Sequence, residues 1–135
     1  MKPQVRVLIA DDRPTTRQGL KALLSLVPQV LLVGEAADGQ ECVDLVMKCN
    51  PDVVVMDLQL PVMDGVEATR LIKERWPAVR VIALTMHARY RSDALAAGVD
   101  AFLLKDGRPE PLLQAILGQD FSSPGQPVTP WSTVS

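Results

Sequence analysis

The chain alternates between short runs of apolar residues and longer segments in which apolar residues recur every three or four positions. The short runs are too short for helices and rich in β-branched residues, which is typical of strands buried on both faces of a parallel sheet. We expect strands at residues 5–10, 30–36, 53–56, 79–85 and 100–104.

Helices are expected between these strands, because residues that start and stop helices flank each periodic segment. Pro14 is placed as a first-turn proline, Asp38 and Asp64 as N-caps, and Gly98 as a stop. The expected helices span about residues 14–27, 38–49, 64–76, 88–97 and 109–117. Strict alternation of strand and helix predicts an α/β fold with right-handed crossovers. The best match is the flavodoxin-like doubly wound sheet of five parallel strands in the order 2-1-3-4-5, with five helices.

The length of the chain and the composition of its C-terminal part predict one domain followed by a tail. A chain of 135 residues has the length of a single domain with a proper core, and we expect this domain to span residues 1–120. Residues 121–135 are rich in proline, serine and threonine and have no periodic apolar face. This composition predicts a flexible tail or a truncated interdomain linker.

Composition and charge exclude several classes of function. A net charge of -2 and a pI near 5.3 provide no positive field for nucleic acid, so we expect no direct DNA binding by this chain. No apolar run approaches the roughly 18 residues that span a bilayer, so we expect no membrane association and a cytoplasmic protein. Neither a dinucleotide-binding GxGxxG loop nor a P-loop is present.

The two cysteines, Cys42 and Cys49, lie on one predicted helix. Their separation along its axis is about 10 Å, which is beyond the reach of a disulfide. We therefore expect two small apolar core residues.

Polar side chains stand at the ends of four predicted strands. Asp11 and Asp12 follow the first strand, Asp57 follows the third, Thr85 ends the fourth and Lys105 follows the fifth. In the order 2-1-3-4-5 the first and third strands are neighbours, so the three carboxylates converge where open α/β sheets bind their ligands.

Three clustered carboxylates need a cation nearby. Two carboxylates about 5 Å apart repel by roughly 3 kcal/mol at an effective dielectric constant near 20. An all-oxygen site with room for water suits Mg2+, which often completes its coordination shell with phosphate oxygens. Given a phosphoryl donor, Asp57 can attack as a nucleophile, while Mg2+ and Lys105 neutralise charge and Thr85 donates a hydrogen bond.

Four motifs in order carry a family resemblance: DD at 11–12, VVVMDLQLPVMDG at 53–65, LTMH at 84–87 and AFLLKDG at 101–107. Over residues 4–119 the chain resembles the receiver domains of two-component response regulators, most of all those attached to LuxR-type helix-turn-helix output domains. The resemblance implies that a sensor histidine kinase phosphorylates Asp57 and that the phosphorylated chain forms a homodimer. The signal would then pass through the surface built from residues 88–117 to an output domain that controls transcription, which we expect to be absent from this chain.

The resemblance also implies a set of metal ligands. Asp12 and Asp57 would ligate Mg2+ directly, together with the backbone carbonyl of Gln59, while Asp11 would act through water.

Further roles follow from the same resemblance. Thr85 and Phe102 would form a switch pair, in which the hydroxyl moves toward the phosphoryl group and the ring turns inward behind it. The side chains expected to tune phosphate hydrolysis are Gln59, Met86 and His87.

Three positions depart from the common receiver pattern. Arg13 would weaken Mg2+ binding if it turned inward, but we expect it to face solvent, and the Mg2+ affinity of Arg13→Ala tests this. Met86 replaces a small residue and is expected to lengthen the lifetime of the acyl phosphate, which Met86→Ala tests. Asp106 follows Lys105 where proline is common, and a non-proline cis bond costs about 2.5 to 4 kcal/mol, which disfavours a cis bond here.

Other functions remain as alternatives to a transcriptional receiver. The chain could be a stand-alone receiver that acts by protein–protein interaction, a degenerate receiver that only binds, or a phosphatase of the haloacid dehalogenase type. The phosphatase needs a second acid two residues after its nucleophile, where this chain has Gln59. Residues 89–91 are either part of a partner surface or a solvated charged face.

Overall fold

The structure is a computed structural model that describes residues 3–118, so the predicted tail at 121–135 lies outside it. The strands are β1 (Val5–Ala10), β2 (Val30–Ala36), β3 (Val53–Met56), β4 (Arg80–Thr85) and β5 (Ala101–Leu104). The helices are α1 (Pro14–Ser25), α2 (Gly39–Cys49), α3 (Gly65–Arg75), α4 (Arg91–Ala97) and α5 (Glu110–Leu117), with a 3-10 turn η1 (Ala88–Tyr90) before α4. The predicted strands and helices are therefore all present.

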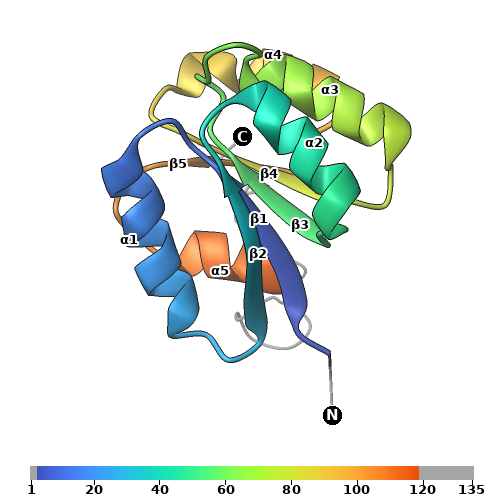
Figure 1. The fold of residues 1–135 in the computed structure, drawn as a ribbon. Coiled ribbons are helices and arrows are strands. Elements are labelled where there is room, and N and C mark those ends of the chain that lie inside the picture. The colour runs from blue at the N-terminus through green and yellow to red at the C-terminus, as the bar shows by residue number, and fades with distance from the viewer. Residues whose placement is uncertain (1–2, 119–135) are drawn as a thin grey trace, which may run out of the picture.

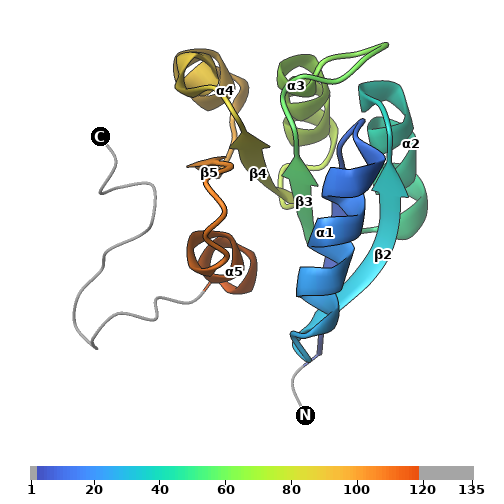
Figure 2. The ribbon, with the colours of Figure 1, turned by 90° about the vertical axis from the view of Figure 1, so that its left-hand side faces the viewer.

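The five strands form one parallel sheet in the order β2-β1-β3-β4-β5, which confirms the predicted doubly wound fold. Helices α1 and α5 cover one face of the sheet, and α2, α3 and α4 cover the other (Figures 1 and 2). Because the strands are parallel, β1, β3, β4 and β5 all end at the same edge of the sheet. This edge is where the sequence places its polar residues.

Each face of the sheet carries its own apolar layer. Along β1, Val7 and Ile9 pack with Leu24 and Ile116 on the side of α1 and α5, whereas Leu8 joins the layer under α2, α3 and α4. This alternation follows from the two-residue period of a strand, which sends neighbouring side chains to opposite faces. The loops that follow the strands therefore extend from a sheet that is packed on both faces.

The segment predicted as one helix at 88–97 is divided in the structure. Residues Ala88–Tyr90 form the 3-10 turn η1, and the α-helix begins only at Arg91. His87 supplies no side-chain hydrogen bond to this helix start, and the amide of Tyr90 binds the carbonyl of His87 at 3.3 Å. A first turn without a side-chain cap is satisfied by tighter bonds of this 3-10 type.

Arg80 joins the start of β4 to the end of α5. Its Nη1 donates to the carbonyl of Ala115 at 2.7 Å, and its Nη2 donates to the carbonyl of Ile116 at 2.7 Å. A cation at this position satisfies the last carbonyls of a helix and interacts favourably with the helix dipole. The end of α5 is therefore fixed at the edge of the sheet where the strands begin.

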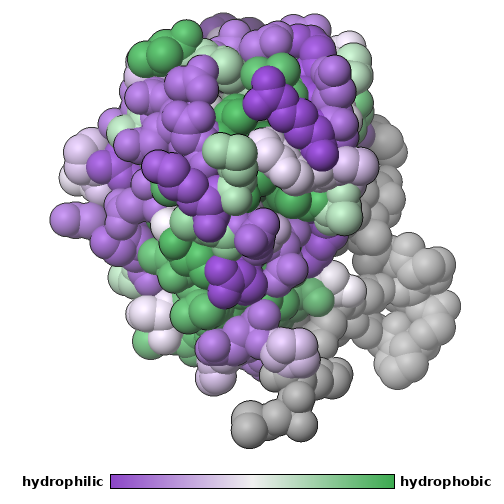
Figure 3. Space-filling model, turned by 45° about the vertical axis from the view of Figure 1, so that its right-hand side comes forward, coloured by the Kyte–Doolittle hydropathy of each residue, from purple (hydrophilic) through white to green (hydrophobic). Residues whose placement is uncertain are grey.

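The outer surface over α2 and α3 is mainly hydrophilic, with apolar side chains in small groups (Figure 3). Within residues 3–118, no helix has both the length and the apolar character needed to cross a bilayer. The peptide bond between Lys105 and Asp106 is trans, as are the other peptide bonds of the described residues.

Candidate functional site

Asp57 lies directly after β3 and is almost completely buried, with 7% of its surface exposed. Its amide donates to the carbonyl of Ala10 at 2.9 Å, which continues the pairing of β3 with β1. Its Oδ1 accepts a hydrogen bond from the amide of Gln59 at 3.1 Å. Gly65 lets the start of α3 approach closely, because a Cβ there would lie 2.3 Å from the backbone oxygen of Asp57. The orientation of the Asp57 carboxylate is thus set by local backbone.

Asp11 and Asp12 follow β1 on the neighbouring strand. The buried Asp11 accepts a hydrogen bond from the amide of Arg13 on Oδ1 at 2.8 Å, while the Asp12 side chain is exposed. The guanidinium of Arg17 donates to the backbone carbonyl of Asp11 at 2.6 Å. These contacts hold the loop that carries both acids.

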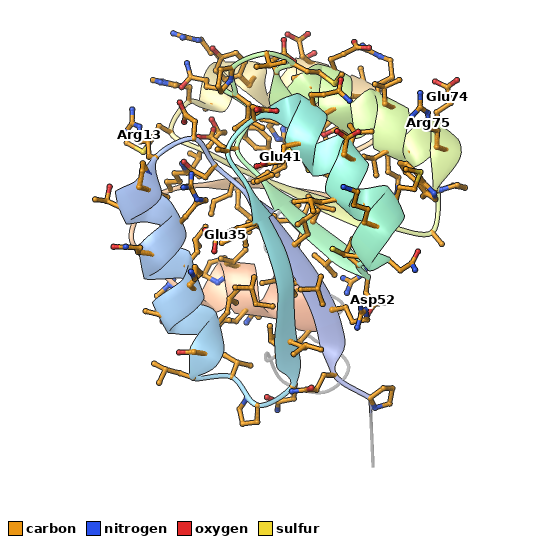
Figure 4. All side chains as sticks on the ribbon, in the orientation of Figure 1. Arg13, Glu35, Glu41, Asp52, Glu74 and Arg75 are labelled. Carbon is orange, nitrogen blue, oxygen red and sulfur yellow. The ribbon has the colours of Figure 1, made fainter. Side chains whose placement is uncertain are left out.

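Arg17 is itself anchored on β2. Its Nε donates to Glu35 Oε1 at 3.1 Å, and Lys21 Nζ lies 2.8 Å from Glu35 Oε2. Figure 4 shows Glu35 between β2 and α1. The hydrogen bond from Lys21 lowers the pKa of the Glu35 carboxyl below 4.5, with a further contribution from Arg17 and an opposing one from burial. A charged network on α1 therefore supports the acid loop.

The carboxylates of Asp11, Asp12 and Asp57 converge as the sequence predicts. One ligand oxygen from each lies within 4.8 Å of the others. Lys105 Nζ bridges the two buried acids, at 2.7 Å from Asp11 Oδ2 and 3.2 Å from Asp57 Oδ2. One ammonium balances only one of three negative charges, so the cluster keeps an excess of negative charge.

The donor set of this cluster fits Mg2+. It consists of carboxylate oxygens, which this hard cation prefers, and Asp12 faces solvent, where water can complete an octahedral shell. The three carboxylates close enough together to hold such an ion are those of Asp11, Asp12 and Asp57.

Thr85 and Phe102 lie on the neighbouring strands β4 and β5, on the same face of the sheet. Phe102 pairs with Ala83, and Thr85 is two residues further along the same strand, so both side chains face the layer of α2, α3 and α4. Both are buried. The Thr85 hydroxyl accepts a long hydrogen bond of 3.4 Å from the amide of His87.

The three residues expected to tune hydrolysis stand on two loops beside Asp57. Met86 is 56% exposed, and His87 meets the ring of Tyr90 edge to face, with 6.1 Å between the ring centroids. The Nε2 group of Gln59 donates to the hydroxyl of Tyr90 at 3.2 Å. Gln59 and His87 thus converge on one tyrosine.

Sequence reasoning missed Arg17 and Tyr90 as parts of this region. Arg17 is one of several polar residues in the pattern of α1, and Tyr90 lies five residues beyond the end of β4. Neither directly follows a strand, and the prediction considered only residues that do. Arg13 is exposed and points away from the molecule in Figure 4, as expected from the sequence.

Comparisons with known proteins place this geometry in a family. A family model for the response regulator receiver domain matches residues 7–117. The transcriptional regulatory protein DegU of Brevibacillus brevis is 36% identical over 115 residues, which cover 84% of this chain and 49% of that protein. The nitrate/nitrite response regulator protein NarL of Escherichia coli (strain K12) is 36% identical over 112 residues, covering 82% of this chain and 52% of that protein.

Solved structures give the same answer. The crystal structure of a two-component response regulator of the LuxR family from Aurantimonas sp. SI85-9A1 has a TM-score of 0.79 and 35% identity, covering 90% of this chain and 91% of that chain. The present chain spans about half the length of the curated relatives described above. With its fold, its acidic cluster and these matches taken together, the chain belongs to the receiver domains of two-component response regulators of the LuxR/NarL type.

Proposed function

We propose that Asp57 accepts a phosphoryl group from the phosphohistidine of a sensor histidine kinase, and that the phosphorylated receiver controls transcription through an output domain. The observation that carries this proposal is the setting of the Asp57 carboxylate. Its Oδ2 lies 3.2 Å from Lys105 Nζ, and the acids Asp11 and Asp12 supply oxygens within 4.8 Å. A nucleophile between a cation site and an ammonium is suited to attack on an anionic phosphoryl group.

The transfer makes one bond and breaks one bond. A carboxylate oxygen of Asp57 bonds to phosphorus, the P–N bond to the donor imidazole breaks, and the imidazole keeps the electron pair. Asp11, Asp12 and Asp57, with the backbone carbonyl of Gln59, would hold Mg2+, which would neutralise charge on the phosphoryl oxygens. Lys105 shares its ammonium between two acids before transfer and compensates the charge that arrives on Asp57.

Thr85 and Phe102 then change the surface of the domain. The long bond from the His87 amide to the Thr85 hydroxyl is readily exchanged for a bond to a phosphoryl oxygen. Phe102 belongs to the apolar layer under α4 on the same face of the sheet as Thr85, so we expect movement of the hydroxyl to alter the packing of that ring. Exposed Leu95 and Leu104, on α4 and β5, offer apolar contacts to a second copy of the chain on this surface.

The chain acts as a switch rather than a turnover enzyme, and it works in the cytoplasm, where its kinase exposes the phosphohistidine. Met86 stands directly after Thr85 and shields the acyl phosphate from water. The Met86→Ala variant, once phosphorylated, therefore loses phosphate faster than the wild type.

Phosphorylation by a small donor tests the proposal. The purified chain is incubated with acetyl phosphate and Mg2+, and its intact mass and sedimentation are measured. We expect a mass increase of one phosphoryl group together with dimer formation, and neither in Asp57→Asn, which keeps the side-chain shape without the nucleophile. Phosphoryl incorporation by Asp57→Asn, or none by the wild type with either acetyl phosphate or a phosphohistidine donor, would overturn the proposal.

A further inference from the structure

The hydroxyl of Tyr90 links the loop that carries Asp57 and Gln59 to the turn after β4. It accepts a hydrogen bond from Gln59 Nε2, on the loop after β3, at 3.2 Å. It also accepts one from Arg89 Nη2, on the turn after β4, at 3.3 Å. One oxygen thus receives donors from two segments that are 30 residues apart in the chain, from Gln59 to Arg89.

Contacts on several sides fix the position of this hydroxyl. The guanidinium carbon of Arg89 lies 5.1 Å from the centroid of the Tyr90 ring, within the range of a cation–π interaction. His87 meets the same ring edge to face, and the ring packs against the apolar layer that contains Phe102. Because the ring is held this way, its oxygen is a defined acceptor and not a freely moving one.

Gln59 is the residue that this acceptor controls. Its backbone amide binds Asp57 Oδ1 at 3.1 Å, so the root of the side chain stays beside the carboxylate. Its side chain is exposed, and within the described residues the bond to Tyr90 is the one side-chain hydrogen bond that holds its amide. A glutamine amide beside a phosphoryl group can orient a water molecule for attack.

We propose that Tyr90 is a positioning residue that holds the Gln59 amide and thereby slows hydrolysis of the phosphoryl group on Asp57. In that hydrolysis a water oxygen bonds to phosphorus, the bond from phosphorus to the Asp57 oxygen breaks, and the carboxylate and inorganic phosphate are released. The water proton leaves with the phosphate or passes to solvent, and Tyr90 exchanges no proton. This inference rests on the proposed role of Asp57.

The Tyr90→Phe variant tests the inference, because it removes the acceptor oxygen and keeps the ring. Wild type and variant are phosphorylated with acetyl phosphate, freed of donor, and followed by the loss of phosphoryl mass. Releasing one hydrogen bond on the glutamine is expected to speed the decay on the order of fivefold.

A second background distinguishes positioning from a general loosening of the site. In Gln59→Met, which keeps the length of the side chain without the amide, Tyr90→Phe should leave the decay rate unchanged. Unchanged decay in the wild-type background, or equal acceleration in both backgrounds, would overturn the inference.

A measurement on the unphosphorylated protein separates this inference from the proposed function. The side-chain amide resonance of Gln59 should shift in Tyr90→Phe, and the backbone resonances of α3 should not. An unchanged Gln59 resonance overturns the inference whether or not the chain accepts phosphate, whereas failure of the wild type to take up phosphate overturns only the role of Asp57.

Discussion

At the scale of single residues, the two cysteines of α2 differ in exposure although they share a helix. Cys42 is completely buried, and this burial raises the pKa of its thiol to about 12, whereas Cys49 is partly exposed. The expectation of two core cysteines is met fully by Cys42 and only partly by Cys49. Because the thiolate is the reactive form, the two should differ in chemistry.

Alkylation at neutral pH checks this difference. We expect iodoacetamide to label Cys49 and to spare Cys42 in the folded protein, while both react in urea. Peptide mapping by mass spectrometry assigns the label. A Cys49→Ser variant that still takes up label in the folded state would contradict the assigned burial.

Glycine is required at position 65 because other backbone atoms lie too close for a Cβ, and not because of its dihedral angles. A Cβ at Gly65 would lie 2.6 Å from the Cα of Leu58 as well as close to the Asp57 carbonyl, and both are backbone atoms that cannot turn aside. We expect Gly65→Ala to lower the free energy of unfolding by about 2 kcal/mol or more, measured by urea titration. It should also shift the loop that carries Gln59.

Gly19 provides a matched control for this substitution. It lies inside α1, and a Cβ there meets no atom within 4 Å. Gly19→Ala is therefore expected to raise the free energy of unfolding by roughly 0.5–1 kcal/mol, because alanine favours the helix. Similar losses in both variants would mean that the close approach at Gly65 is not the cause.

The residues of the acidic cluster could be predicted from the sequence because each stands next to a strand. Parallel topology brings the strand ends that carry Asp11, Asp57 and Lys105 to one edge of the sheet, and the long Lys105 side chain reaches across that edge to both acids. Arg17 and Tyr90 reach the same region through long side chains from helical segments. The positions of their polar groups depend on rotamers and on partners such as Glu35 and Gln59, and the periodicity of the sequence predicts neither.

At the scale of elements, an ion network joins α1 to β2 beside the acid loop. The carboxylate of Glu35 forms ion pairs with Lys21 and Arg17, and these lower its pKa below 4.5. A carboxyl group whose pKa is lowered by folding stabilises the folded state above its unfolded pKa. This contribution is lost as the pH falls from 4.5 through the lowered value.

The Glu35→Gln variant tests this pH dependence. Its free energy of unfolding should fall below that of the wild type at neutral pH, and the gap should close as the pH drops below 4.5. Because the Glu35 side chain is 37% exposed, solvent screens the pairs, and we expect a gap of at most about 1 kcal/mol. Glu74→Gln is the control, because Glu74 is an exposed acid near the end of α3 for which the described residues contain no ion pair. A gap that stays constant with pH would argue against the network.

The exact ends of helices are predicted less well by the apolar pattern than the helices themselves. The apolar period predicts a helix through 88–97 but cannot tell the 3-10 turn of η1 from the α-helix that follows at Arg91. The distinction depends on capping, since His87 gives the helix start no side-chain partner. Elsewhere helix capping agrees with the sequence: Asp38 and Asp64 accept from the amides of Glu41 and Glu67 at 2.7 and 2.9 Å.

At the scale of the whole molecule, the excess negative charge of the acidic cluster should couple Mg2+ binding to stability. Ligand that binds only the folded state at a concentration of 100 times Kd adds about 2.7 kcal/mol. We expect the melting temperature to rise with added Mg2+ at constant ionic strength. Asp12→Asn, which removes the exposed ligand of the cluster, should reduce that rise, and Arg13→Ala should leave it unchanged. An equal rise in Asp12→Asn would contradict the assigned ligands.

The global fold follows from the sequence more completely than the details of the site. Alternation of strand and helix, with no long insertion, admits few sheet orders, and the observed order is the predicted one. The proposed switch of Thr85 and Phe102 depends on two alternative packings of the same side chains, and the pattern of apolar residues in the sequence does not distinguish them.

The hydrogen bonds from Arg80 to the end of α5 have a consequence for how a change at Asp57 is transmitted through the domain. They fix the departure point of the remaining chain at the pole where strands begin, and β4 with its six residues separates that pole from the reactive carboxylate by roughly 20 Å. A change at Asp57 therefore reaches the end of α5 through altered side-chain packing along the sheet and not through direct contact.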